Sequence, residues 1–596
     1  MPGREAASPS KPVYDRCSPV RWIVSHILRY PLLPLAQTVL TIVAIALGTR
    51  SPVYLGRTLD HVLSPQRNPR TLLLLSLAVV GYRFAEAALD ATQRVVGEFL
   101  SRRVQRDARD ELYASLLGKS LSFHSRQRAG DLITRVSDDT RNLNYMLSPG
   151  LRTLFGWLVG LIVPLVAIGA LSPKLLTVPL ASVLLLVASA WGHARRIKPV
   201  ADELRAQLSE INAGLTETLT GIEVVKASAR ESEEKRAFRA RVRRARELQA
   251  RYGALEAAYL PALVRHAMLA AGFVHGLLLH TQGALTIGSI VAFVGLLGRL
   301  SPPMPAILSV IVRGLTGAQR ILAVTSSDAK SGEDQRGISG PVRGEVAFEG
   351  VSFGYDGARV LEEVSFRARP GETIAIVGPT GAGKTTLTRL INRIYDADRG
   401  RVLVDGVDVR EWDLASLRSQ ISTIEQDVFL FQRTVGENIA FGAQGLVSPA
   451  QIEHCARDAQ VHEFVARLPQ GYDTLVGERG VRLSGGQRQR IAIARALLGD
   501  PRILILDDST SAIDSATEDR IQTAMERVRR GRTTFLITHR LSLIRRADRV
   551  LVLRRGVLID QGTHNELIRR CTPYRRIFAR RGARAGPGTE NGGRVR

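Results

Sequence analysis

Apolar residues gather into six long runs in the first half of the chain, and the second half contains no run of that length. Each run is close to the roughly 20 residues that a helix needs to cross a bilayer. The runs cover residues 32–55, 71–93, 151–171, 174–194, 257–281 and 286–311. This pattern predicts an all-α membrane domain with six transmembrane helices over residues 21–325.

The connections between these runs indicate their orientation. Tight turns join runs three and four and runs five and six, whereas about 60 residues separate runs two and three and runs four and five. Both long connections are rich in arginine, from Arg102 to Arg109 and from Arg236 to Arg246. Because positive charge marks cytoplasmic loops, we expect both termini in the cytoplasm. We also expect the membrane helices to continue into the cytoplasm as solvated helices.

The segments at the two ends of the chain differ from the rest. Residues 1–20 hold prolines and charges without an apolar core, which predicts a disordered N-terminus rather than a signal peptide. Trp22–Tyr30 is a short amphipathic stretch that we expect at the membrane surface. We interpret the hydrophilic residues 326–340 as a linker and residues 583–596, rich in Gly and Arg, as a disordered tail.

The second half alternates short β-rich runs with helical patterns. This alternation predicts an α/β domain with a largely parallel sheet, over residues 341–582. The expected strands are Val346–Phe348, Thr373–Val377, Val402–Val404, Ile503–Leu506, Thr534–Ile537 and Val550–Leu553.

Composition narrows the function classes. A chain of 596 residues is too long for one compact core, and its three cysteines, Cys17, Cys455 and Cys571, lack the spacing of a disulfide scaffold or a zinc finger. The net charge of +26 could mean nucleic acid, anionic lipid or cytoplasmic loops of a membrane protein. No aromatic or base-reading pattern accompanies the arginines, so we expect no nucleic-acid partner.

A phosphate-binding loop follows the buried strand Thr373–Val377 and precedes a helical pattern over Leu387–Tyr395. This strand, loop and helix match GxxxxGK followed by Thr. The glycines let backbone N–H groups turn towards phosphate oxygens, Lys384 would neutralise the β- and γ-phosphates, and the Thr385 hydroxyl can bind Mg²⁺. The cofactors are therefore expected to be ATP and Mg²⁺. The loop residues are Gly378, Pro379, Thr380, Gly381, Ala382, Gly383, Lys384, Thr385 and Thr386.

Two further elements support a nucleotide site. The apolar strand Ile503–Leu506 ends in Asp507, whose carboxylate can hold Mg²⁺. Before it, Leu483–Gln487 leads into the helical stretch Arg488–Leu498, so Ser484 and the N–H groups of the following glycines can form a second anion site. The residues of that site are Ser484, Gly485, Gly486 and Gln487.

LSGGQ placed between a phosphate loop and an acidic strand resembles the signature of ATP-binding-cassette (ABC) proteins. The resemblance covers residues 345–580 and implies further roles. Tyr355 resembles the aromatic residue that stacks on adenine, Gln426 the residue that contacts Mg²⁺ and the attacking water, and His539 the sensor of the γ-phosphate. Gly477–Gly480 resembles a loop that touches the membrane domain, and Ser511–Asp514 one that crosses the dimer interface.

Six spans followed by one cassette resemble an exporter-type half-transporter. Phe123–Arg135 and Gly221–Lys226 resemble the two cytoplasmic coupling regions of such exporters. In the family, ATP lies between the phosphate loop of one cassette and the signature of another. The resemblance therefore implies a second half-transporter as partner.

The sequence departs from the family at Asp508, where the general base is usually Glu. The side chain is shorter by one C–C bond, about 1.5 Å. A general base must lie within hydrogen-bond reach of its water. Two readings follow: Asp508 works as a slower base, or this chain is the degenerate-site subunit of a heterodimer. We favour the heterodimer, in which the intact signature would serve the competent site of the partner.

Three arginines lie deep within the predicted spans, at Arg83, Arg265 and Arg299. A lone charge at that depth costs at least about 2.5–3.5 kcal/mol on insertion scales. Arg83 can pair with Glu86 at i+3, whereas no local partner is evident for Arg265 or Arg299. These two arginines suggest a cationic cavity suited to an anionic or amphiphilic cargo.

These observations predict ATP-driven transport in the plasma (bacterial inner) membrane, most simply export of an amphiphilic, lipid-like or drug-like molecule. The partners would be a second half-transporter, membrane lipid and the transported molecule. One alternative is an importer with the exporter fold, for instance for a siderophore. A soluble ABC ATPase acting on nucleic acid is disfavoured by the six spans. The remaining alternative is a regulatory or channel-like subunit, whose cassette mainly opens and closes a pathway through the membrane.

Overall fold

The computed structural model describes residues 14–65, 68–300, 305–327, 337–355, 357–443, 445–477, 480–507 and 525–576. By their contacts they divide into two compact units. One lies within residues 1–117 and 127–328, and the other within 118–126 and 329–596. Each unit is described by itself below.

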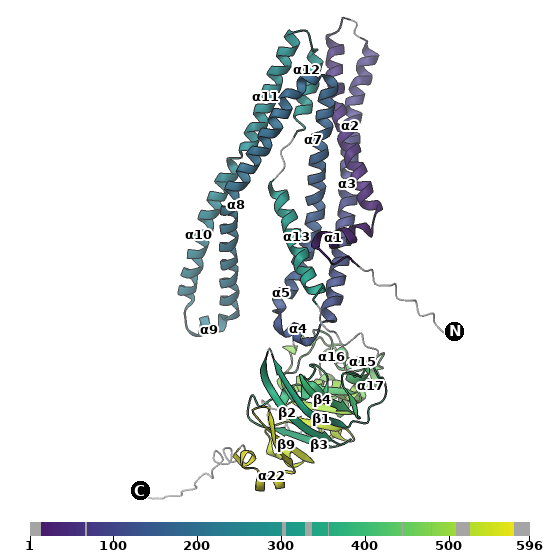
Figure 1. The fold of residues 1–596 in the computed structure, drawn as a ribbon, viewed down its shortest axis with the longest axis vertical. Helices are drawn as coiled ribbons and strands as arrows, with labels where there is room; N and C mark the ends of the chain where they lie inside the picture. The colour runs from purple at the N-terminus through teal and green to yellow at the C-terminus, as the bar shows by residue number, and fades with distance from the viewer. Residues whose placement is uncertain are drawn as a thin grey trace, which may run out of the picture. The chain divides into compact units, whose positions relative to one another are not determined.

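The first unit is all-helical (Figure 1). Its long helices are α1 (Pro19–Leu28), α2 (Leu32–Leu63), α3 (Pro69–Leu117), α7 (Arg152–Leu171), α8 (Thr177–Thr220), α10 (Glu231–Ala257), α11 (Leu260–Thr281), α12 (Ile287–Leu297) and α13 (Pro305–Thr325). Shorter pieces are α5 (Ala129–Thr134), η1 (Arg135–Asp139), α6 (Thr140–Tyr145), η2 (Met146–Leu151), η3 (Pro173–Leu176) and α9 (Ile222–Ala227), while α4 (Leu121–Arg126) belongs to the second unit.

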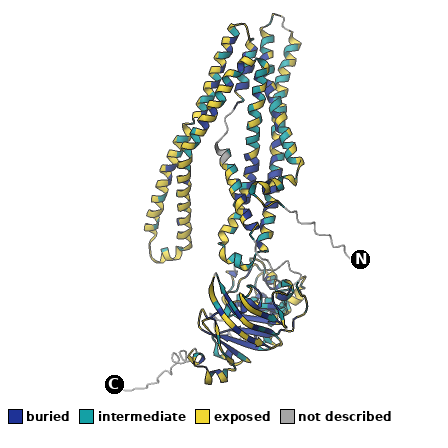
Figure 2. Cartoon of the chain, viewed as in Figure 1, coloured by how far each residue is buried: buried dark blue, intermediate teal, exposed yellow. Residues whose placement is uncertain are grey.

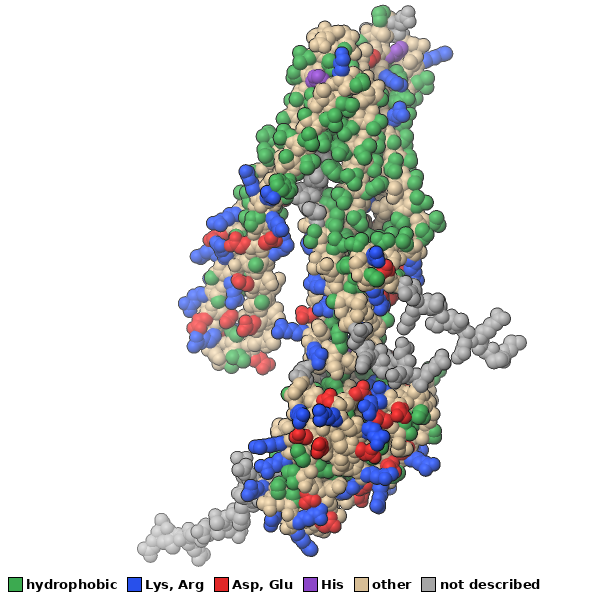
Figure 3. Space-filling model, in the orientation of Figure 1, with side chains coloured by type: hydrophobic (Ala, Val, Ile, Leu, Met, Phe, Trp, Pro, Cys, Tyr) green, Lys and Arg blue, Asp and Glu red, His purple; other side chains and the backbone are tan. Residues whose placement is uncertain are grey.

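Large apolar side chains cover the outside of these helices. Within the described residues five helical stretches are long and apolar enough to cross a membrane: Leu32–Leu63, Pro69–Leu117, Ala129–Leu171, Pro173–Thr220 and Glu231–Thr281. Exposed residues run along them in Figure 2, and hydrophobic side chains gather on them in Figure 3. Phe84 and Leu184, for example, are 77% and 75% exposed. Lipid is the environment in which such a surface is stable. The predicted helical transmembrane domain is confirmed.

The sixth predicted span differs from our expectation of one helix over 286–311. In the structure α12 ends at Leu297 and α13 begins at Pro305, and residues 301–304 lie outside the described residues. Gly298, directly after α12, is a poor helix former, which accounts for the end of that helix.

The long connections are helical, as predicted. α3 has 49 residues and α8 has 44, so both continue well past their apolar segments. α8 and α10 lie side by side and are joined by the short α9 (Figure 1). Charged side chains gather over the part of these two helices near α9 (Figure 3).

The amphipathic stretch near the N-terminus forms α1, which begins at Pro19. Trp22 is buried, and its indole N–H donates a 3.0 Å hydrogen bond to Glu111 on α3. Valines and leucines on the other face, such as Val20 and Leu28, are exposed. Such a face suits an interfacial helix.

The cassette unit contains two sheets. A four-stranded sheet has the order β2-β1-β4-β5, and a six-stranded sheet has the order β10-β9-β3-β8-β7-β6. The strands are β1 (Val346–Tyr355), β2 (Ala358–Ala368), β3 (Thr373–Val377), β4 (Arg399–Val404), β5 (Val407–Asp408), β6 (Ile421–Ile424), β7 (Ile503–Asp507), β8 (Thr533–Ile537), β9 (Arg549–Arg554) and β10 (Val557–Gly562). The helices are α14 (Lys384–Ile391), α15 (Leu414–Ser419), α16 (Val435–Ala440), α17 (Pro449–Asp458), α18 (His462–Val465), α19 (Gly485–Leu498), α21 (Leu541–Arg545) and α22 (His564–Arg570), with a 3₁₀ turn η5 (Gly471–Asp473).

The larger sheet is parallel from β9 to β6, as expected, but the smaller sheet is antiparallel throughout. Two of the predicted strands, Val346–Phe348 and Val402–Val404, belong to this antiparallel sheet. Only a short turn separates β1 from β2, and its Gly357 has a φ of +85°. A connection that short forces a hairpin, because parallel neighbours need a long crossover.

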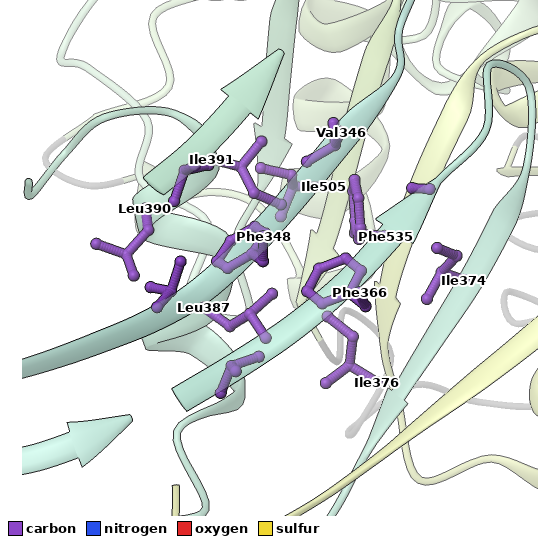
Figure 4. Packing of buried hydrophobic residues seen from close by; sticks show 14 of the residues in the cluster. Val346, Phe348, Phe366, Ile374, Ile376, Leu387, Leu390, Ile391, Ile505 and Phe535 are labelled. Carbon is purple, nitrogen blue, oxygen red and sulfur yellow. The ribbon is translucent and has the colours of Figure 1, made fainter. Parts of the chain in front are cut away.

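One face of α14 packs into the main core of the cassette (Figure 4). Leu387, Leu390 and Ile391 lie in a cluster with Phe348 and Ile505. All five residues are at most 2% exposed. This packing fixes the helix whose N-terminus carries the phosphate loop.

Candidate functional site

The phosphate loop has the backbone that phosphate binding requires. All five residues of β3 are buried, and the loop follows at once. Gly381 and Gly383 have φ values of +78° and +95°, in the left-handed region that favours glycine. A Cβ at Gly383 would lie 2.7 Å from a methyl carbon of Leu361 and 2.9 Å from the carbonyl oxygen of Val360. Gly378 is equally tight, because a Cβ there would overlap the carbonyl of Leu553.

The phosphate loop and the acidic end of β7 meet at the start of α14. Thr385 Oγ1 donates a 2.7 Å hydrogen bond to Asp507 Oδ2 at the end of β7. Lys384 Nζ donates 3.0 Å hydrogen bonds to the carbonyl oxygens of Gly378 and Pro379, so the ammonium folds over its own loop. The structure therefore joins Thr385 and Asp507, two residues predicted to hold Mg²⁺. Hydroxyl and carboxylate oxygens are suitable ligands for that ion.

Gln426 and His539 follow strands on either side of β7. The last residue of β6, Ile424, pairs with Leu506, and the last residue of β8, Ile537, pairs with Asp507. Both residues lie two positions beyond these strand ends; Gln426 is exposed and His539 is half-buried. Because the strands are parallel, the phosphate loop, Asp507, Gln426 and His539 share the carboxyl edge of one sheet, where α/β proteins bind ligands.

Tyr355 lies at the end of β1, in the other sheet. Its hydroxyl shares a 3.3 Å hydrogen bond with Thr386 Oγ1, which places the ring beside the phosphate loop. The ring also packs on Phe353 and on Tyr395, a residue that the sequence analysis did not single out. The only sequence signal for Tyr395 is its place shortly after the phosphate-loop helix.

The signature residues form a helix cap. Ser484 caps α19: its hydroxyl accepts a 3.3 Å hydrogen bond from the Gln487 N–H, and the Gln487 side chain accepts a 2.9 Å bond from the Ser484 N–H. The helix begins at Gly485, earlier than the predicted Arg488, because this capping box satisfies its first N–H groups. Among the described residues no hydrogen bond joins Ser484 or Gln487 to the phosphate loop of the same chain.

Several predicted site residues lie outside the described residues. These are Asp508, Ser511–Asp514, and Glu478 and Arg479 of the loop Gly477–Gly480.

In the membrane domain, Glu86 on α3 pairs with two of the three deep arginines. Arg83 lies 3.3 Å from its carboxylate, as the i+3 spacing predicted. Arg299, just beyond α12, forms an ion pair and hydrogen bonds with the same carboxylate. A Cβ at Gly48 on α2 would overlap both side chains, so this glycine makes room for the pair. No local partner was evident for Arg299 in the sequence, and the structure supplies one from a distant helix.

Arg265 differs from Arg299. It is half-buried on α11, and within the described residues it forms no ion pair. The nearby His266 and His275 bond to backbone carbonyls, at 2.7 Å from Ala262 O and 3.1 Å from Lys174 O.

Comparison with known proteins agrees with this geometry. Residues 361–511 match the family model described as ABC transporter, and residues 35–304 match the one described as ABC transporter transmembrane region. The ATP-dependent lipid A-core flippase of Syntrophus aciditrophicus (strain SB) is 33% identical over 517 residues, which are 86% of each protein. The putative multidrug export ATP-binding/permease protein YgaD of Bacillus subtilis (strain 168) is 32% identical over 508 residues, 81% of this chain and 84% of that protein.

A solved structure of a bacterial Atm1-family ABC exporter with ATP bound superimposes with a TM-score of 0.78 at 30% identity. The match covers 93% of this chain and 99% of that chain. The chain thus belongs to the ABC transporters, as an exporter-type half-transporter that fuses a transmembrane domain to one ATP-binding, ATP-hydrolysing cassette.

Proposed function

We propose that this protein exports an amphiphilic, lipid-like or drug-like molecule from the cytoplasmic side of the bacterial inner membrane. The observation that carries the proposal is the fusion, in one chain, of an apolar helical domain with a phosphate loop tied to Asp507. The names of the relatives support this choice, since they describe lipid A-core flippases and a putative multidrug export protein. Both termini would lie in the cytoplasm.

The functional residues of the cassette would have distinct roles in ATP binding and hydrolysis. Lys384 and the backbone N–H groups of the phosphate loop would bind the ATP phosphates, and Tyr355 would stack on adenine. Thr385, Asp507 and Gln426 would hold Mg²⁺, which supplies neutralisation of phosphate charge. Gln426 would orient the attacking water, Asp508 would accept its proton, and His539 would sense the γ-phosphate.

Movement would follow from closure of two cassettes around ATP. Each ATP would contact the phosphate loop of one chain and the helix cap of Ser484–Gln487 of the other. Closure would carry the coupling regions, Phe123–Arg135 and Gly221–Lys226, and turn the membrane cavity outward. Hydrolysis would then reset the transporter.

Inside-out membrane vesicles test the direction and the class of cargo. We expect ATP-dependent accumulation of a fluorescent amphiphile in vesicles that contain the protein, and none in vesicles that contain Lys384→Ala. Loss of the amphiphile from preloaded vesicles on addition of ATP would instead indicate import.

We further propose that the partner is a second, different half-transporter. The support is Asp508, which stands where the family has Glu. In this arrangement the phosphate loop, Asp507 and Asp508 of this chain form the weak site. Ser484–Gln487 complete the competent site of the partner.

Two substitutions in the purified complex separate the two assemblies. Asp508→Asn should change total ATPase activity little, whereas Ser484→Arg should abolish most of it by blocking phosphate contact. If Asp508→Asn alone removes nearly all activity, Asp508 is a working base and a homodimer is the better account.

A further inference from the structure

Three aromatic rings meet beside the phosphate loop, and their planes are crossed. Tyr355 lies nearly perpendicular to Phe353, at 89° and 5.0 Å between ring centroids. It lies nearly perpendicular to Tyr395 as well, at 84° and 5.2 Å. Tyr395 and Phe353 are themselves 5.4 Å apart. Edge-to-face contacts of this kind have a preferred direction, so they restrict rotation of the ring between them.

Tyr395, the third ring of this group, lies in the turn that follows α14, and hydrogen bonds hold this turn in place. Arg393 is 8% exposed, and its guanidinium donates hydrogen bonds to Asp396 Oδ1 at 3.0 Å and to the carbonyl of Arg410 at 3.2 Å. The Asp398 carboxylate accepts a 2.8 Å hydrogen bond from the Gly354 N–H. The backbone N–H of Asp398 donates a 3.0 Å hydrogen bond to Ser352 O. These bonds fix the turn on the end of β1, next to Tyr355.

We propose that Tyr395 is a positioning residue for the nucleotide base: it holds the Tyr355 ring in the plane on which adenine stacks. The inference rests on the proposed role of Tyr355 in the nucleotide site. Tyr355 is fixed at its hydroxyl by Thr386 and at its ring by Phe353 and Tyr395. A platform that is already ordered loses less conformational entropy when a base binds.

The ring of Tyr395, rather than its hydroxyl, carries this role. Among the described residues its hydroxyl forms no hydrogen bond, whereas its ring contacts both neighbours. Phe at this position should therefore work as well as Tyr, and a branched aliphatic residue should not.

Binding of two ligands to the full-length protein without Mg²⁺ tests this role. ATP carries the base, whereas inorganic tripolyphosphate carries only the phosphates. Tyr395→Leu should weaken ATP binding roughly two- to tenfold, the range of one aromatic contact, and leave tripolyphosphate binding unchanged. Tyr395→Phe should match the wild type for both ligands. Equal weakening for ATP and tripolyphosphate would overturn the proposal, as would no change for either.

Two further variants complete the experiment. Tyr472→Leu removes a half-buried tyrosine of the second cassette core, which bonds to His462, and controls for general loss of packing. It should lower the melting temperature without changing the ratio of the two affinities. Tyr355→Leu distinguishes a failure of the positioning role of Tyr395 from a failure of the adenine platform. If it weakens ATP binding while Tyr395→Leu does not, only the positioning role is wrong. If it leaves ATP binding unchanged, the adenine platform itself is wrong.

Discussion

Thr385 donates its hydroxyl hydrogen to Asp507 over 2.7 Å, across 122 residues of sequence. The bond joins the first turn of the phosphate-loop helix to the end of β7, which β8 separates from β3 in the sheet. Both side chains present oxygen atoms, and each is already oriented by the other. An ion held between them would meet a preformed pair of ligands.

Asp507→Asn should therefore weaken binding of Mg²⁺ at the ATP site of this chain. The variant keeps the shape and the hydrogen bond from Thr385 but removes the charge. We expect the Mg²⁺ concentration for half-maximal photolabelling of this chain by an ATP analogue to rise about 10- to 100-fold, the range seen when groups that support a metal are altered. ATP binding without Mg²⁺ should be unaffected. An unchanged Mg²⁺ requirement would remove Asp507 from the metal site.

The Glu86–Arg299 pair predicts a coupled effect on stability. Arg299→Gln and Glu86→Gln should each lower the thermal stability of the solubilised protein, because Glu86→Gln leaves Arg299 without its carboxylate and Arg299→Gln leaves Glu86 with Arg83 alone. The double variant should lose less than the sum, with a coupling energy of about 1–3 kcal/mol between contacting residues. Strict additivity in thermal unfolding would argue against the pair.

Arg265 should behave differently, because it forms no ion pair in the described part of the chain. Arg265→Gln should leave stability and basal ATPase activity nearly unchanged and reduce transport of an acidic amphiphile relative to a neutral one of similar size. Equal loss for both cargo types would contradict a role for this charge in cargo selection.

Attachment of α1 should depend on Glu111. This carboxylate is 8% exposed. Burial alone would raise its pKa, but His26, whose ring nitrogen lies 3.4 Å away, and hydrogen bonds from Arg16 and Trp22 outweigh that effect and hold the pKa below its usual 4.5. A carboxyl group whose pKa is lowered by folding stabilises the folded state above that usual value. The stability is lost as the pH falls through the lowered pKa.

Two measurements follow from this assignment. Amide hydrogen exchange of residues 19–28 at pH 7 should be faster in Glu111→Gln than in the wild type. The difference in thermal stability between the two proteins should shrink below pH 4.5. Glu98→Gln, on the same helix but 46% exposed and paired with Arg102, should show neither effect. Similar exchange in all three proteins would mean that Glu111 does not hold α1.

Local sequence patterns predicted most helices and strands of the cassette. Contacts between residues distant in sequence explain where a predicted helix end was wrong. β3 is the predicted Thr373–Val377, because a run of buried β-formers between a turn and a glycine loop has few alternatives. The helix after the loop was predicted to reach Tyr395 but ends at Ile391. The turn at Arg393, with a φ of +43°, is stabilised by Asp396 and by the carbonyl oxygen of Arg410, and the second of these contacts is not local.

The same reasoning applies to the sites. The Thr385–Asp507 bond could be anticipated because each residue belongs to a motif with a known place at the strand ends. The Glu86–Arg299 pair could not, since 213 residues separate its members and neither belongs to a motif. The place of Tyr395 beside Tyr355 could not be predicted either, because it depends on the approach of a turn to β1.

Transport by proteoliposomes containing Lys384→Ala tests the central claim most directly, namely that ATP bound at this phosphate loop drives movement of the cargo. Lys384 would neutralise the phosphates, so the variant should lose photolabelling by an ATP analogue. Its ammonium donates to two carbonyl oxygens of its own loop, and we expect the protein to remain folded without these bonds. The account predicts ATP-dependent movement of a fluorescent amphiphile with the wild type and no movement above protein-free liposomes with Lys384→Ala. Undiminished labelling together with undiminished movement in Lys384→Ala would contradict it.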